Sequence, residues 1–317
     1  MKILREQCQK SADNLRKKME NIADASADFF GLYEAEALNE DEIAKSIEKA
    51  VYSESYATLL KFSQKVLFVI QADGVSCSFR RILPLIIDPV AESNDKEFAV
   101  IFSSGTKSFN EADARELLGS ELFDKYLSKI VFHDCDNTES HAYYGVTQLK
   151  SPILINNIYL KYDLTVTVGD VTYDNEKGFT GGRDLVFTGL ASRKSYFRNR
   201  LLSFDITENK RHELSRAGEI HKNPVHRDLV DAVMTSRARR TFFSFNTVAD
   251  SAGNIIALAC GDLFMAHHRA CDMLDSHLCV KAEKKYNSML VTGDFASLKY
   301  TAQKLQRFSE ILAARTW

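Results

Sequence analysis

One loop of the sequence gathers residue types that bind ligands. This glycine-rich loop, residues 169–184, reads GDVTYDNEKGFTGGRD and holds four of the chain's 14 glycines together with Asp174 and Asp184. Glycines let backbone N–H groups approach a phosphate, and Arg183 adds a guanidinium that binds oxyanions. The same glycines are typical of a tight turn between a strand and a helix. Both interpretations stay open on this loop alone.

Three further loops carry polar side chains directly after apolar runs. The first, residues 72–79, contains Asp73 and Ser76, the second, residues 103–113, contains Lys107, and the third reads FHDCDN. Ligands of parallel α/β sheets bind beyond the carboxyl ends of the strands, where such loops meet. We therefore expect these loops and the glycine-rich loop to converge on one cleft.

The charged side chains of this cleft allow two kinds of chemistry. Lys107 and Asp174 would form a proton-transfer pair if burial tuned their pKa values. Alternatively, Lys107 forms an ion pair with Asp174 or Asp184, and Arg200 pairs with Asp184. Buried pairs of this kind can serve structure alone. The sequence favours the structural interpretation over new catalysis.

Hydrophobic patterning predicts the elements that position these residues. The continuous apolar run at 65–73 is typical of a buried parallel strand, and the segments 97–106, 152–163 and 164–170 predict further strands. The segment 110–119, NEADARELLG, predicts a helix that begins with an Asn cap and ends at a glycine. Strands alternating with helices predict an α/β fold, a mostly parallel sheet flanked by helices.

Composition narrows the class of protein. The chain has 317 residues, 45% of them hydrophobic, which suits one or two domains. Its 41 Lys and Arg residues balance 43 Asp and Glu residues without a basic block, so we expect no nucleic-acid partner. Six cysteines without a CxxC pair indicate reduced thiols. With no signal-peptide pattern and no long apolar segment, we expect a cytoplasmic protein that does not enter membranes. Its oligomeric state is left open.

The order of the loops resembles the lactate racemase family, enzymes that interconvert 2-hydroxy acids with a nickel-pincer nucleotide cofactor. The segments ADGVS, GTKSFNEADARELLG, VFHDCDN, YYGVT and GFTGGRD follow one another in the family's order and near its spacing. The resemblance runs from about residue 40 to at least residue 270. It implies that residues 1–270 form the family's N-terminal α/β domain. Residues 271–317 would then be a linker helix and the truncated start of a second, smaller α/β domain that is largely missing.

The resemblance also implies where the family's chemistry would lie. Lys107 and Asp174 stand where the family has its acid/base histidines, and Asp184 stands where a lysine bonds covalently to the cofactor. Arg200 stands at the position of a histidine that ligates nickel, and Ser76 at that of an arginine. The cofactor-binding positions implied in this chain are Asp73, Ser76, Gly181, Gly182, Arg183 and Asp184.

These substitutions conflict with the family's mechanism. A carboxylate at Asp184 has no amine for a covalent link, and the protonated guanidinium of Arg200 has no lone pair for a metal. We therefore expect neither a bound cofactor nor a metal. Two functions stay open: a divergent racemase or epimerase of 2-hydroxy acids, and a non-catalytic protein on the same scaffold. The latter would bind a small molecule, such as a 2-hydroxy acid or a nucleotide-like ligand, or an interaction partner.

Overall fold

The computed structural model describes most of the chain, namely residues 35–72, 77–237, 240–250 and 252–279. These residues belong to one compact unit, Glu34–Cys279. The positions of Asp73 and Ser76 lie outside the described residues, as do residues 280–317, where the start of a second domain is expected.

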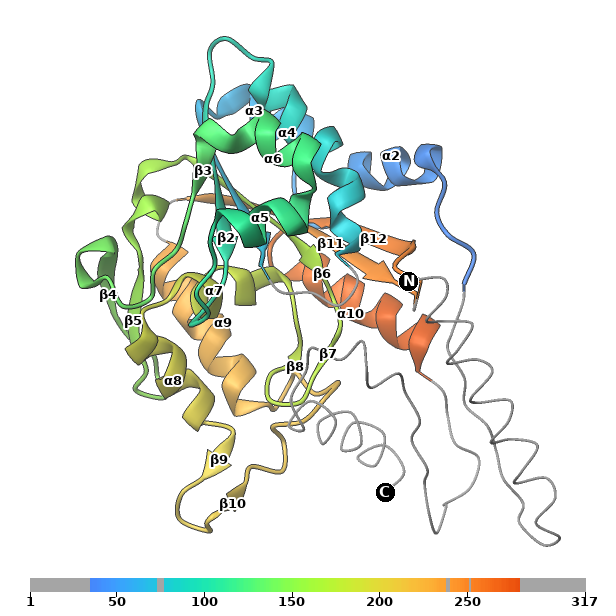
Figure 1. The fold of residues 1–317 in the computed structure, drawn as a ribbon. Coiled ribbons are helices and arrows are strands. Elements are labelled where there is room, and N and C mark those ends of the chain that lie inside the picture. Colours follow the sequence, from blue (N-terminus) through green and yellow to red (C-terminus); the bar gives the residue numbers. More distant parts are fainter. Residues whose placement is uncertain (1–34, 73–76, 238–239, 251, 280–317) are drawn as a thin grey trace, which may run out of the picture. The chain divides into compact units, whose positions relative to one another are not determined.

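A six-stranded sheet forms the centre of this unit, with the strand order β12-β11-β6-β1-β2-β3. The strands are β1 (Lys65–Gln71), β2 (Glu97–Ser103), β3 (Ile130–Val131), β6 (Leu164–Asp170), β11 (Thr241–Ala249) and β12 (Ile255–Gly261). Neighbouring strands are parallel except for β11 and β12, which are antiparallel. The predicted mostly parallel sheet is confirmed (Figure 1).

Helices cover both faces of the sheet. They are α2 (Glu40–Glu48), α3 (Tyr56–Phe62), α4 (Leu83–Ala91), α5 (Glu111–Leu118), α6 (Ser120–Tyr126), α7 (Phe187–Leu190), α8 (Arg193–Leu201), α9 (Pro224–Arg237) and α10 (Met265–Leu278). Buried residues of α2 to α6 join one apolar cluster, whereas those of α7 and α9 join a second and those of α10 a third. Within the described residues, no helix combines the length and apolar character needed to cross a bilayer.

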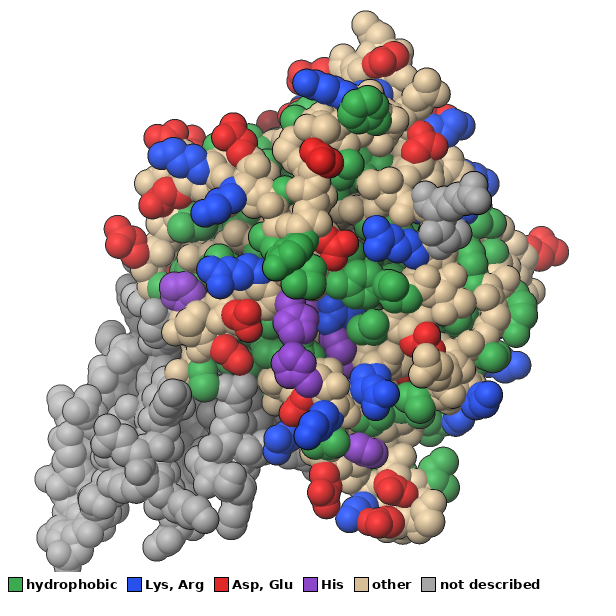
Figure 2. All heavy atoms as spheres, turned by 180° about the vertical axis from the view of Figure 1, so that it is seen from behind, with side chains coloured by type: hydrophobic (Ala, Val, Ile, Leu, Met, Phe, Trp, Pro, Cys, Tyr) green, Lys and Arg blue, Asp and Glu red, His purple; other side chains and the backbone are tan. Residues whose placement is uncertain are grey.

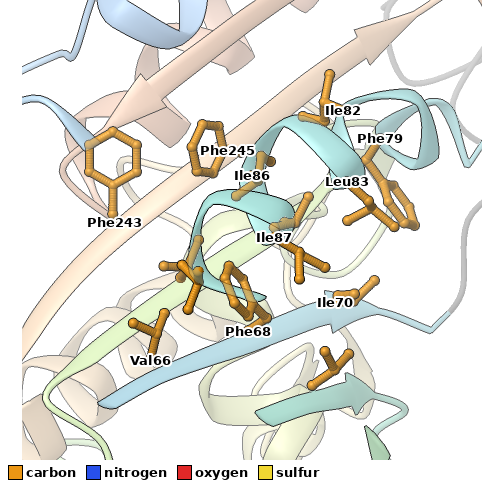
Figure 3. Packing of buried hydrophobic residues seen from close by; sticks show 14 of the residues in the cluster. Val66, Phe68, Ile70, Phe79, Ile82, Leu83, Ile86, Ile87, Phe243 and Phe245 are labelled. Atoms are coloured by element: carbon orange, nitrogen blue, oxygen red, sulfur yellow. The ribbon is translucent and has the colours of Figure 1, made fainter. Parts of the chain in front are cut away.

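Strand β1 shows why an unbroken apolar run is needed here. Its residues Val66, Phe68 and Ile70 pack into the first cluster, against α4 (Figure 3). Leu67 and Val69 pack into the second cluster, on the opposite face. Side chains of a strand alternate between faces, so a strand covered on both sides buries the side chains of both sets, which favours apolar residues at successive positions. Each buried side chain of this size contributes about 1.5–3 kcal/mol to folding.

Local signals fix the ends of several elements. The predicted helix at 110–119 is α5, which Asn110 opens with a capping box and which stops at Gly119, where φ is +81°. The strand predicted over 152–163 is wrong beyond residue 156. Strand β5 (Pro152–Asn156) pairs with β4 (His141–Val146) in a separate hairpin. The Asn156 side chain then accepts the N–H of Ile158 and begins the 3-10 helix η4 (Asn157–Lys161) instead.

Candidate functional site

A small polar cavity lies where β2, the glycine-rich loop and helices α7 and α8 meet. Its volume is about 90 Å³. Among the sequence-predicted residues, Lys107, Asp184 and Arg200 all line it, each from a different segment. The complete lining is Ser103, Ser104, Gly105, Thr106, Lys107, Lys177, Asp184, Leu185, Thr188, Gly189, Tyr196 and Arg200.

Asp170 anchors the start of the glycine-rich loop at the end of β6. Its buried carboxylate accepts hydrogen bonds from the hydroxyl of Ser78 (2.6 Å), from the backbone N–H of Ser78 (3.1 Å) and from the hydroxyl of Thr247. One carboxylate thus connects the segment after β1, the end of β6 and strand β11. This connection holds the loop in place relative to the sheet.

Packing within the chain accounts for the glycines of this loop. Gly181 and Gly182 have φ values of +87° and +56°, in the left-handed region that favours glycine. A Cβ atom on Gly182 would lie 2.7 Å from the ring of His267, and one on Gly178 would lie 2.2 Å from the backbone oxygen of Glu219. The glycines therefore allow close approach of other parts of the protein. The loop itself folds into the short hairpin β7 (Tyr173–Asp174) and β8 (Gly178–Phe179), followed by the 3-10 helix η5 (Gly182–Leu185).

Lys177 is the central cation of the site, and sequence reasoning missed it. Its Nζ atom contacts the carboxylate of Asp184 and lies 3.6 Å from that of Asp174. Only 7% of the Lys177 side chain is exposed. Its position in the sequence could have indicated this role, because Lys177 lies within the glycine-rich loop, three residues after Asp174 and directly before Gly178.

The ion pairs of Arg200 and Asp184 differ from the one predicted between them. The predicted pairing of Arg200 with Asp184 is replaced by contacts of Arg200 Nη1 with Glu176 (3.3 Å) and Asp174 (4.0 Å). Asp184 instead forms a salt bridge with Lys177, and the hydroxyl of Thr188 donates a hydrogen bond to the Asp184 carboxylate. Asp174 and Glu176 are not among the residues that line the cavity, so part of this ion-pair network lies behind its wall.

Electrostatics fixes the charge state of this network. Burial would raise the pKa of Asp174, but the charges of Lys177 and Arg200, with two backbone N–H donors, hold it far below its usual range. Burial would likewise lower the pKa values of Lys177 and Arg200, yet the neighbouring carboxylates raise both. All three groups stay charged at neutral pH. A residue with such a distant pKa is a poor general acid or base, since proton transfer is most efficient when the pKa lies near the working pH.

Arg183 points away from the cavity, contrary to its predicted place in the cleft. It is buried, and donates to His226 and to the backbone oxygen of Phe264. Burial lowers its pKa to about 10. The buried His226 and His267 stack with ring centroids 6.4 Å apart, and Figure 2 shows histidine side chains gathered on the face that it views.

The chain matches a family model over most of the region just described. That model, the lactate racemase N-terminal domain, matches residues 17–212. This chain belongs to the lactate racemase family. The sequence resemblance to that family is therefore confirmed.

Curated relatives and solved structures agree with the family. The chain is 24% identical to the lactate racemase of Thermoanaerobacterium thermosaccharolyticum over 258 residues and 24% identical to that of Lactiplantibacillus plantarum over 262 residues. Both matches cover 80% of this chain and 58% of the relative, so the chain spans little more than half the length of these lactate racemases.

The fold is also similar to that of two solved structures. The lactate racemase apoprotein from T. thermosaccharolyticum superposes with a TM-score of 0.68 at 22% identity, over 78% of this chain and 57% of that one. A protein from Thermotoga maritima superposes with a TM-score of 0.60 at 18% identity, over 77% of this chain and 60% of that one. These likenesses place the described unit in the fold of the lactate racemase family.

Few side chains of the cavity lining could ligate a metal ion. Among the described residues that line it, there is no histidine or cysteine, and Asp184 is the one carboxylate. Asp184 is engaged by Lys177 and Thr188. A divalent nickel ion prefers imidazole or thiolate ligands, which this lining does not offer.

One group elsewhere brings metal-binding residue types together. Asp134, Cys135 and Asp136 hold their ligand atoms within 4.8 Å of one another, which no other group in the described part of the chain does. However, both oxygens of Asp136 accept hydrogen bonds from Arg193, each at 2.6 Å. That guanidinium already neutralises the Asp136 carboxylate, so this group lacks a free anionic ligand at that position.

Proposed function

We propose that this protein is a lactate racemase family member that binds a small molecule in the cavity without nickel-dependent racemisation. The observation that carries this proposal is the state of Asp184. At the position where the family anchors its cofactor through lysine, a carboxylate is held by Lys177 and Thr188. A carboxylate in this setting offers no amine for a covalent link.

Arg200 supports the same conclusion. It stands at the position of the family's nickel-ligating histidine, and its pKa is raised by Asp174 and other neighbours even though burial opposes the charged form. A protonated guanidinium repels a metal cation and has no lone pair to donate. Nickel at this place would face a positive charge instead of a ligand.

The acid/base positions add a further argument. Racemisation of a 2-hydroxy acid needs a group that removes the proton of the hydroxyl and returns it. The pKa of Asp174 is held far below neutrality, mainly by Lys177 and Arg200 acting against burial. Asp174 is therefore too weak a base for this task, and Lys107 would have to act without it.

The size of the cavity limits the ligand. Its volume of about 90 Å³ is several times smaller than the roughly 300–1,000 Å³ of pockets that hold drug-sized molecules. A molecule of a few non-hydrogen atoms fits this volume better than a nucleotide does. The proposed ligand is accordingly small.

A second candidate is an active racemase or epimerase of 2-hydroxy acids with altered catalytic residues. It is favoured by membership of the family and by 24% identity to two lactate racemases. Lys107, which lines the cavity, would be its acid/base residue. This candidate requires a cofactor held in another way than through residue 184.

Elemental analysis and a chiral assay separate the two candidates. The chain is co-expressed with the enzymes that synthesise the cofactor, and nickel per mole of purified protein is measured together with the interconversion of D- and L-lactate. The lactate racemase of T. thermosaccharolyticum, expressed in the same cells, is the positive control. We expect no retained nickel and no interconversion. Stoichiometric nickel, or racemisation above the rate without protein, would establish the second candidate instead.

A further inference from the structure

Two histidine side chains from different segments of the chain meet outside the cavity. His268 lies on α10, and His221 lies in the segment that leads to α9. Their ring centroids are 5.3 Å apart, with an angle of 54° between the ring planes. His221 is exposed and His268 is partly buried, and neither is among the residues that line the cavity. Solvent can therefore reach both rings.

The separation of the two rings suits one metal ion between them. Zn²⁺ in proteins is usually tetrahedral, with imidazole nitrogens about 2.0–2.1 Å from the metal. Since the centre of an imidazole ring lies roughly 1 Å behind its nitrogen, two rings on one such ion have centroids about 5 Å apart. The 5.3 Å between His221 and His268 meets this condition. The stacked pair of His226 and His267, at 6.4 Å, does not.

The ring nitrogens of the pair are available to a metal. Within the described residues, no hydrogen bond engages a ring nitrogen of His221 or His268. The adjacent His267 differs, because its Nε2 atom lies 2.8 Å from the backbone oxygen of Thr180. Metals bind the neutral form of imidazole, and burial, followed by the charge of Arg183, lowers the pKa of His268. His268 is therefore in its metal-binding form at neutral pH.

The backbone holds His221 in place beside α10. Ile220, directly before it, is buried in the same apolar cluster as Ala270 of α10. Two residues after it, the buried Asn223 donates a hydrogen bond to the backbone oxygen of Glu176 (2.8 Å). The chain is thus fixed on both sides of His221. Ligands that are already in place lose less conformational entropy when a metal binds.

One carboxylate lies close enough to assist. Asp272 is four residues after His268 on α10, so the two side chains share a face of the helix. Its negative charge acts on His268 against the effects of burial and of Arg183. The same negative charge would offset the repulsion between Arg183 and a metal cation.

We propose that His221 and His268 bind a divalent transition-metal ion, with Zn²⁺ as the ion that fits their separation and with Asp272 and water completing its coordination. Such an ion joins the segment before α9 to α10 and so stabilises the packing between them. The site is separate from the cavity. It requires neither the nickel cofactor nor a ligand in the cavity, so it does not depend on the proposed function.

Isothermal titration with Zn²⁺ alone tests the proposal, on protein without an affinity tag that has been freed of metal with EDTA and dialysed. We expect a single Zn²⁺ to bind per chain. His221→Gln and His268→Gln should each lower the affinity by at least about tenfold, because even the loss of a group that only supports a metal ligand costs about 10–100-fold. Asp272→Asn should lower it by a smaller factor. His277→Gln, on the same helix, is the matched control and should leave it unchanged.

Thermal unfolding gives a second readout of the same site. A ligand that binds only the folded protein raises its stability, so Zn²⁺ should raise the melting temperature of wild type and of His277→Gln. It should not raise that of His221→Gln or His268→Gln. Mg²⁺ should have no such effect on wild type, because it prefers oxygen ligands to imidazole.

Three results would overturn the proposal. They are no binding of Zn²⁺ to wild type at concentrations up to about 1 mM, equally tight binding of Mg²⁺, and wild-type affinity for Zn²⁺ in both His221→Gln and His268→Gln, shown to be folded by circular dichroism. The proposed loss of nickel-dependent racemisation stands or falls separately, by the interconversion of lactate. Nickel measured in His268→Gln distinguishes metal held by this pair from metal held elsewhere.

Discussion

The Nζ atom of Lys177 contacts the carboxylate of Asp184, seven residues further along the glycine-rich loop. This contact joins the turn of the β7–β8 hairpin to the 3-10 helix η5. With 7% and 13% of the two side chains exposed, the pair is largely shielded from water. It therefore behaves as a buried ion pair. Removal of one partner of such a pair destabilises the fold by more than the intact pair stabilises it.

Lys177→Met should destabilise the protein by about 3–5 kcal/mol, because it leaves Asp184 and Asp174 buried without their shared cation. Urea denaturation gives the free energy of unfolding. Lys65→Met is the matched control, since the pair of Lys65 with Glu97 is about half exposed and should contribute much less to the free energy of unfolding. Equal losses in the two variants would show that Lys177 is not a buried partner.

Asp184→Lys should also destabilise the fold, because it places a second ammonium group beside Lys177. The double variant Asp184→Lys with Lys177→Ala removes this repulsion, and its free energy of unfolding should exceed that of the single variant by at least about 1 kcal/mol. Coupling of this size is typical of residues in direct contact. Additive effects of the two substitutions would contradict the contact seen here.

Acidification should destabilise the protein below pH 6.5 through His226 and His267. Burial, followed by the charge of Arg183, lowers the pKa of both residues well below 6.5. Between those lowered values and pH 6.5 the unfolded chain binds protons that the folded protein does not, so the free energy of unfolding falls as pH falls. The slope is about 1.4 kcal/mol per pH unit for each histidine.

The test is urea denaturation at several pH values for wild type and His267→Gln. The variant should lose part of the slope below pH 6.5, whereas His277→Gln, a partly exposed residue on the same helix, should keep it. An unchanged slope in His267→Gln would mean that this histidine is protonated in the folded state.

Gly182→Ala should be more harmful than Gly105→Ala. The two glycines have φ values of +56° and +61°, so each alanine carries a similar backbone strain of about 1–2 kcal/mol. At residue 182 the new Cβ would lie 2.7 Å from the ring of His267, whereas at residue 105 its nearest neighbour would be the ring of Tyr196 at 3.3 Å. We expect an additional cost of about 1–3 kcal/mol at residue 182, measured by thermal unfolding. Similar melting temperatures would show that His267 can move aside.

The sheet was the part of the fold that sequence reasoning predicted best. Unbroken apolar runs mark β1 and β2 because both faces of these strands are covered by helices. The same rule misled at residues 152–163, since an apolar run does not show where a strand stops. There the Asn156 side chain captures a backbone N–H and turns the chain into a 3-10 helix.

The site was predicted less completely. Lys107, Asp184 and Arg200 were expected in one cleft, and all three line the cavity. Lys177 was overlooked because a lysine in a polar loop is ordinarily exposed. Arg183 was misplaced because it and Asp184 are successive residues of a 3-10 helix, which turns about 120° per residue and sends neighbouring side chains in different directions.

The close approach of Gly182 to His267 also has an evolutionary consequence. The ring of His267 fills the space that a side chain at residue 182 would need. A relative that carries a larger residue at the first position can keep this packing only with a smaller residue at the second. The two positions, 85 residues apart in the sequence by their numbering, are thus expected to change together across the family.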